Sequence, residues 1–122
     1  MSEIKDLNDM ADWEAMWDEQ KAEDAGGLLV FKRSPVCPTS FTAEERFRKF
    51  VSSLPESKDL RIVSVDVIAA RPISRRIAEL TGIKHESPQA LLISRGQNVR
   101  WHASHLDITE DSLAEALLAA KV

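Results

Sequence analysis

Cysteine is almost absent from this sequence, since Cys37 is the only one among 122 residues. A single thiol cannot form an internal disulfide, so any disulfide must join the chain to another molecule, and this usage suits a reducing compartment. An excess of basic residues is also absent. The formal net charge of −4 argues against nucleic acid as a partner, because binding phosphates requires a basic patch.

Long apolar runs are missing as well. No segment approaches the ~20 residues that a membrane-spanning helix needs, so we expect no membrane span. The N-terminal segment MSEIKDLNDM is acidic and lacks the basic and apolar regions of a signal peptide, which predicts a cytoplasmic protein. Because repeats and dividing linkers are absent, we expect residues 1–122 to form one domain, long enough to bury a hydrophobic core.

The sequence does contain apolar periodicity of two kinds. Helical spacing of apolar residues occurs in 10–17, 47–54, 73–80 and 113–118. Strand-like runs or alternation occur in 28–31, 60–67, 90–93 and 99–103. We expect the first helix to end at Gly26-Gly27, and the third to begin at Pro72 and stop at Gly82. The last helix should have Thr109 as its N-cap. Its predicted buried face consists of Leu113, Leu117 and Leu118.

The predicted order of elements is a helix, a β-α-β unit, a further helix, and a β-hairpin followed by the last helix. A β-α-β unit joins two parallel strands by a right-handed crossover, and the hairpin adds two more strands. This order predicts an α/β, thioredoxin-like fold with a four-stranded mixed sheet flanked by helices and an extra N-terminal helix. Other small α/β domains share parts of the same order.

The single cysteine follows a buried strand and precedes a helix. Pro38 fits the first helical position, and the unpaired N–H groups and dipole of a helix that begins there would favour a thiolate at Cys37. The segment TAEE at 42–45 also fits a capping box, which would start the helix later and remove the thiol from the dipole. We favour the earlier start because of Pro38.

The tetrad Cys37-Pro38-Thr39-Ser40 has a serine where a Cys-x-x-Cys redox motif has its second cysteine. A dithiol mechanism is therefore excluded, and only a monothiol mechanism remains. The alternative is that Cys37 is inert, since free cysteines are among the most buried residues. The tetrad alone leaves both interpretations open.

Three separated motifs then point to a family: FKRSPVCPTS, VDVIAARPISRRIAELTGIKHESPQALLI and VRWHASHLDIT. In this order they closely resemble the monothiol bacilliredoxins, the thioredoxin-like YtxJ proteins, from about Met10 to the C-terminus. Family members more often carry histidine at the position of Arg33 and isoleucine at that of Thr39. These two differences bear on the selectivity for thiols and leave the thiol chemistry itself intact.

The resemblance implies a function in redox homeostasis. Cys37, in an active-site loop with Ser34, Pro38, Thr39 and Ser40, would remove the small thiol bacillithiol from S-thiolated client proteins, and a second thiol would restore the enzyme. The small thiol would be a co-substrate, and no resident cofactor or metal is implied. We expect a monomer.

The resemblance also implies further site residues. Pro88 matches the cis-proline that faces the cysteine in thioredoxin-like folds, and the backbone of Ser87 would pair with the backbone of a substrate. Bacillithiol carries a malate, so its site should hold cationic groups. The candidates, which would otherwise be solvated surface charges, are Lys32, Arg33 and Arg71.

Several polar residues have competing interpretations. Asp66 lies in a mostly apolar strand and is either a proton relay or, as we favour, a structural hydrogen-bond acceptor. His85, His102 and His105 together with Cys37 would give a poor metal site, so we predict that the histidines have packing and hydrogen-bonding roles. Trp101 is expected in the core.

Two other functions compete with bacillithiol removal. Monothiol glutaredoxin-like proteins hold an iron–sulfur cluster between two subunits through one cysteine and an external thiol, but their tetrad has Gly-Phe where this chain has Pro38-Thr39. The third interpretation is a thioredoxin-like binding module without catalysis.

Overall fold

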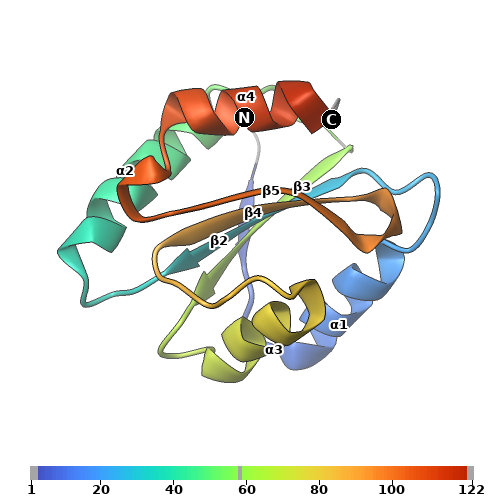
Figure 1. Cartoon of the computed structure of the whole chain (residues 1–122), viewed down its shortest axis with the longest axis horizontal. Helices are drawn as coiled ribbons and strands as arrows, with labels where there is room; N and C mark the ends of the chain where they lie inside the picture. Colours follow the sequence, from blue (N-terminus) through green and yellow to red (C-terminus); the bar gives the residue numbers. More distant parts are fainter. Residues whose placement is uncertain (1–2, 58, 121–122) are drawn as a thin grey trace.

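A five-stranded mixed sheet with the strand order β1-β3-β2-β4-β5 forms the centre of the computed structural model, which describes residues 3–57 and 59–120 (Figure 1). The elements in chain order are β1 (Ile4–Asp6), α1 (Met10–Glu19), β2 (Gly27–Arg33), α2 (Pro38–Ser52), β3 (Leu60–Asp66), α3 (Arg71–Thr81), β4 (Gln89–Ser94), β5 (Asn98–Ser104) and α4 (Glu110–Ala120), with short 3-10 helices at Arg95–Gln97 and His105–Asp107. No helix among these residues is long and apolar enough to cross a membrane.

Strand direction decides which loops meet. β1 and β2 each run parallel to β3, whereas β4 runs antiparallel to β2 and β5 antiparallel to β4. The carboxyl ends of β2, β3 and β5 therefore lie at the same end of the sheet, together with the start of β4. We call this line of strand ends the edge of the sheet, as distinct from an edge strand. The segment that contains Cys37, the start of α3 and the His105–Asp107 turn all follow strands that end at this edge.

The two faces of the sheet are covered by different helices, α2 and α4 on one side and α1 and α3 on the other (Figure 1). Alternation along β2 sends Leu29 and Phe31 to the first core and Leu28 and Val30 to the second. All four side chains are buried, as expected for a strand that is covered on both faces. Phe31 stacks on Phe47 of α2 with ring centroids 4.6 Å apart.

The sheet has one strand more than the four predicted. β1 is a three-residue strand that pairs in parallel with β3, where Ile4 lies opposite Ile62 and the Ser64 hydroxyl donates to the Asp6 carboxylate. A strand of three residues is too short to show an alternation of apolar and polar residues. The sequence therefore carries no signal for β1, which is identified by its pairing with β3.

Two helix predictions need correction. α1 ends at Glu19 instead of at Gly26-Gly27. Gln20 is its C-cap, and the side-chain amide of Gln20 donates to the carbonyls of Gly26 and Ile93, outside the helix. Leu118 is 77% exposed. It directly follows Leu117 on α4, and a step of ~100° around the helix carries it off the buried stripe, which contains Leu113, Ala116 and Leu117.

Other local predictions are confirmed. α2 begins at Pro38 and not at Thr42. Gly82 ends α3 in the left-handed conformation with φ of 72°. The Thr109 hydroxyl accepts a hydrogen bond from the Ser112 N–H at 3.0 Å, as expected of an N-cap.

We predict that Gly26→Ala destabilises the fold by about 3 kcal/mol, because overpacking against rigid backbone costs about that much. A Cβ on Gly26 would lie 2.2 Å from the Asp59 carbonyl oxygen. Gly82→Ala is the matched control: nothing lies near its Cβ, and only its φ of 72° opposes the change, at a cost of about 1 kcal/mol. Urea unfolding measures both, and equal losses would refute the close approach at Gly26.

Candidate active site

Cys37 is the N-cap residue of α2, directly after β2 and its short connection. Its carbonyl accepts the N–H groups of Ser40 and Phe41 at 3.0 and 3.2 Å, which sets the first turn of the helix. Its side chain makes no capping hydrogen bond and is partly exposed. The thiol therefore lies beside the positive end of a helix dipole, where a negative charge is favoured, and the expectation of a buried cysteine, on which the inert interpretation rested, is wrong.

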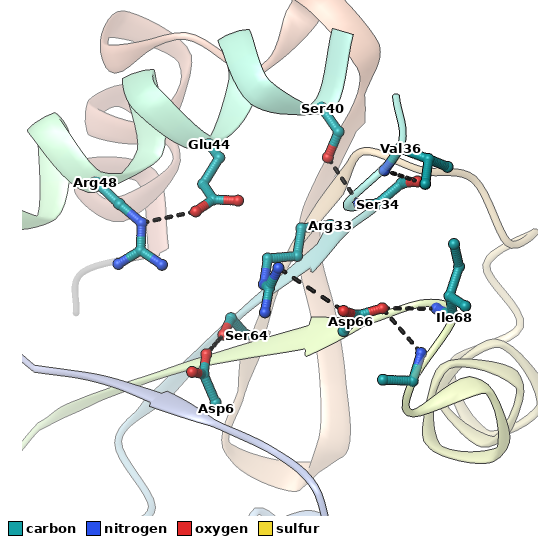
Figure 2. A network of polar contacts seen from close by, with 11 residues as sticks. Asp6, Arg33, Ser34, Val36, Ser40, Glu44, Arg48, Ser64, Asp66 and Ile68 are labelled. Carbon is teal, nitrogen blue, oxygen red and sulfur yellow. Dashed lines mark hydrogen bonds and ion pairs between the residues drawn. The ribbon is translucent and has the colours of Figure 1, made fainter. Parts of the chain in front are cut away.

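The side chain of Ser40, at the position of a second cysteine, is fully buried. Its Oγ accepts a hydrogen bond from the Ser34 N–H at 2.8 Å, and the Ser34 Oγ accepts one from the Val36 N–H at 3.4 Å (Figure 2). These bonds tie the connection after β2 to the first turn of α2. The remaining predicted loop residues, Pro38 and Thr39, lie in that turn and are exposed and half-buried, respectively.

The Ser87-Pro88 peptide bond is cis, as predicted. Lys32 of β2 pairs with Gln89 of β4, so Pro88 lies level with Arg33 at the edge where Cys37 follows. The Pro88 carbonyl accepts a hydrogen bond of 2.9 Å from the N–H of His105, whose φ is 54°. The sheet register thus brings Ser87 and Pro88 to the same end of the molecule as the thiol.

The structure corrects both expectations for Lys32, which were a contact to the small thiol or a solvated surface charge. The side chain is fully buried on the α3 face of the sheet. Its ammonium donates to the Ser74 carbonyl at 2.9 Å and contacts His85 Nδ1 at 3.3 Å. Burial lowers the pKa of Lys32 from 10.5 to about 8.

Arg33 and Asp66 lie opposite each other at the ends of β2 and β3. Arg33 Nη1 lies 3.9 Å from the Asp66 carboxylate, whose Oδ1 accepts the N–H groups of Ile68 and Ala69, both at 2.9 Å (Figure 2). The bond from Ala69, followed by that from Ile68 and the nearby Arg33 charge, lowers the pKa of Asp66. The carboxylate is thus a hydrogen-bond acceptor for the turn after β3, the structural role favoured from the sequence.

The other predicted cation, Arg71, is exposed at the start of α3. Arg33 is half-buried, and its Nε has no hydrogen-bond partner within residues 3–57 and 59–120. Neither observation identifies a ligand, so a role in binding the small thiol stays a prediction for both arginines.

The histidines do not form a common site. His105 lies 3.6 Å from Glu86, and His85 contacts Lys32 and Ser74. In the part of the chain that the structure describes, no group of three or more potential ligand side chains is placed to hold a metal ion. Trp101 is partly buried and packs against the core under α2 and α4.

Sequence reasoning missed four exposed apolar residues at this edge. Val36 is 74% exposed beside the cysteine, and Phe41, Ile68 and Leu106 are 54%, 48% and 57% exposed. They lie after β2, in the first turns of α2, after β3 and after β5. Each belongs to a segment near the carboxyl end of a strand. This shared position is a sequence signal, but it groups the four residues only when the strand directions are known. We call these four residues the apolar rim.

We predict that Ser40→Ala lowers the free energy of unfolding by about 1–3 kcal/mol, because the buried N–H of Ser34 loses its acceptor. The matched control is Ser52→Ala on the same helix, where the serine is exposed and a change of at most about 0.5 kcal/mol is expected. Denaturant unfolding monitored by tryptophan fluorescence measures both. Equal, small losses would show that the Ser34 bond does not stabilise the loop.

We predict that burial of Lys32 makes stability depend on pH. Below its folded pKa of about 8 the charged lysine destabilises the fold, and above the unfolded value of 10.5 that cost is absent. The stability of the wild type relative to Lys32→Met should therefore rise by about 2 kcal/mol between about pH 7 and about pH 9.5. Lys84→Met, at an exposed lysine, is the control, and its difference from the wild type should stay constant. A constant difference for Lys32→Met as well would contradict the buried charge.

Comparison with known proteins agrees with this geometry. Residues 5–113 match the family described as monothiol bacilliredoxin BrxC. A solved candidate oxidoreductase with a thioredoxin fold is 32% identical with a TM-score of 0.75, over 93% of this chain and 92% of that one. Thioredoxin from Trypanosoma brucei brucei is 13% identical with a TM-score of 0.73, over 98% and 91% of the two chains.

Thioredoxin NaTrxh from Nicotiana alata is 16% identical with a TM-score of 0.72, over 97% of this chain and 92% of that one. These two low identities show the fold alone, whereas the family match spans most of the chain and includes Cys37 and Pro88. The chain therefore belongs to the monothiol bacilliredoxin BrxC family, and it is a thiol-disulfide oxidoreductase with a thioredoxin fold.

Proposed function

We propose that Cys37 removes bacillithiol from oxidised protein cysteines. The thiolate attacks the bacillithiol sulfur of a client–bacillithiol disulfide, forms a new disulfide with it, and releases the client cysteine as a thiolate that takes a proton from water. A second thiol then attacks the Cys37 adduct, leaves with the bacillithiol as a disulfide and regenerates the Cys37 thiolate. Each step exchanges one S–S bond for another, so no external oxidant is needed.

The observation that carries this proposal is the isolation of a partly exposed thiol at a helix N-terminus, with a buried serine in place of a second thiol. Without a resolving cysteine, the adduct on Cys37 cannot be released within the molecule. The adduct therefore persists until another thiol attacks it, and this persistence is what a carrier of a small thiol needs. The match to the monothiol bacilliredoxin family supports bacillithiol as that small thiol.

The surroundings of the thiol support protein clients as the other substrate. The apolar rim at Val36, Phe41, Ile68 and Leu106 consists of exposed apolar side chains in segments at the same edge as Cys37, and a surface that contacts client proteins would use exposed apolar area. In this proposal the backbone of Ser87 pairs with the client chain, and Arg33 and Arg71 contact the malate carboxylates. Bacillithiol acts as co-substrate of a cytoplasmic monomer that has no resident cofactor.

Mass spectrometry tests the reaction. After mixing with a protein–bacillithiol disulfide, the wild type should release the client thiol and gain one bacillithiol adduct on Cys37. Cys37→Ser should gain none, because a hydroxyl is far too weak a nucleophile at neutral pH. Ser40→Ala should still gain the adduct, because no step requires the serine hydroxyl.

Two results would contradict the proposal. Loss of transfer in a folded Ser40→Ala variant would mean that the hydroxyl supports the thiolate, and the mechanism would change. A wild type that gains no adduct but readily reconstitutes an iron–sulfur cluster would instead be a cluster carrier.

A further inference from the structure

The loop of residues 84–88, which ends in the cis-proline, is held from three sides by polar groups. The buried Gln89 amide donates to the Lys84 carbonyl at 2.9 Å. The Lys32 ammonium contacts His85 Nδ1 at 3.3 Å from beneath. The N–H of His105 donates to the Pro88 carbonyl at 2.9 Å. The loop is thus anchored at both ends and at His85.

The anchor at His85 uses a buried cation without an opposite charge. Lys32 is fully buried, and its partners are the Ser74 carbonyl and the His85 ring. Burial lowers its pKa, and within residues 3–57 and 59–120 no carboxylate forms an ion pair with it. An apolar side chain of similar length would avoid the desolvation cost. The ammonium therefore has a role other than packing, and that role is hydrogen-bond donation.

What it provides is a fixed donor for one nitrogen of His85. An ammonium can only donate, so Nδ1 must accept, and that requires the neutral imidazole. The Ser74 hydroxyl lies 3.1 Å from the same Nδ1. Protonation of His85 would place a proton on Nδ1 and a second positive charge against Lys32, and the contact would break.

Four charged groups act on His85. They are Lys32 on β2, Arg71 and Arg75 on α3, and Glu86 in the loop itself. Burial, followed by these three cations, lowers the pKa of His85, and Glu86 opposes them. His85 is therefore neutral and bound to Lys32 at neutral pH, and because its pKa is lowered it takes up a proton only in more acidic solution than an ordinary histidine.

We propose that Lys32 is a positioning residue that, through neutral His85, holds the 84–88 loop where Ser87 can pair with a peptide substrate, and that protonation of His85 releases the loop. This inference rests on the proposed reaction of Cys37 with disulfides of client proteins. The contact acts on substrates that have a peptide backbone. A small disulfide without one reaches the thiol without using the loop.

Two probes separate the loop from the thiol. One is bis(2-hydroxyethyl) disulfide, and the other is a short cysteine peptide joined to 2-mercaptoethanol by a disulfide. The readout is the ratio of the second-order rate constant for the peptide disulfide to that for the small disulfide, between about pH 5 and about pH 7, where Lys32 stays mostly charged because its pKa is about 8. Ionisation of Cys37 affects both reactions equally and cancels in the ratio.

In the wild type the ratio should fall about tenfold from neutral to acidic pH, the loss expected for one hydrogen bond to a charged donor. Lys32→Met should show the low ratio at every pH. This low ratio should not come from a loss of stability, because the substitution removes a buried charge that destabilises the fold. His85→Asn, whose Oδ1 replaces the Nδ1 acceptor without titrating, should give a ratio that does not change with pH. His102→Asn, at an exposed histidine of β5, should reproduce the wild-type profile.

A wild-type ratio that is independent of pH would overturn the inference, as would the same acid-side fall in His85→Asn. If Lys32→Met slowed both probes equally, Lys32 would act on the thiol and not on the loop. A wild type that failed to react with bis(2-hydroxyethyl) disulfide would instead refute the reactive Cys37 of the proposed function.

Discussion

The antiparallel pairing of β2 with β4 decides where this site forms. Lys32 lies opposite Gln89, so the strand that leads to Cys37 and the loop that ends in Pro88 meet at one edge of the sheet. In the sequence, α2, β3 and α3 separate them. β2 is buried on both faces, and a slip of one residue would exchange the two sets of core side chains. The register is therefore firmly specified, and the position of the site with it.

The serine that replaces a second cysteine links the chemistry to local structure. Ser40 is buried and accepts the N–H of Ser34, so it shapes the connection from β2 to α2 that presents Cys37. The position next to the thiol that a dithiol enzyme uses for resolution is used here for holding the loop. Release of any adduct on Cys37 is thereby left to an external thiol.

Unfavourable burial is concentrated near the same edge. Among the described residues, the buried side-chain atoms without a hydrogen-bond partner are Trp13 Nε1, Arg33 Nε, Ser87 Oγ and Gln89 Oε1. The last three flank the cysteine loop or the cis-proline, and the buried Lys32 lies beside them. Unpaired buried polar groups lower stability, and proteins tend to tolerate such departures from good packing at functional sites.

The sequence alone determined the elements whose signals are local. Pro38 defined the start of α2, Gly82 the end of α3 and Thr109 the start of α4, and the absence of a second cysteine defined a monothiol chemistry. Each of these depends on backbone geometry or chemistry within a few residues. The cis-proline came from resemblance to a family, because the residues around Pro88 carry no local signal for a cis bond.

Only the tertiary structure decided features that depend on distant partners. β1 is a strand because β3 pairs with it, and Lys32 is a buried donor because β4, α3 and the 84–88 loop enclose it. The apolar rim exists because the strands around it end at the same edge. A lysine has the same local signature on a surface as in a core, since burial is a property of what packs around a residue and not of its neighbours in the chain.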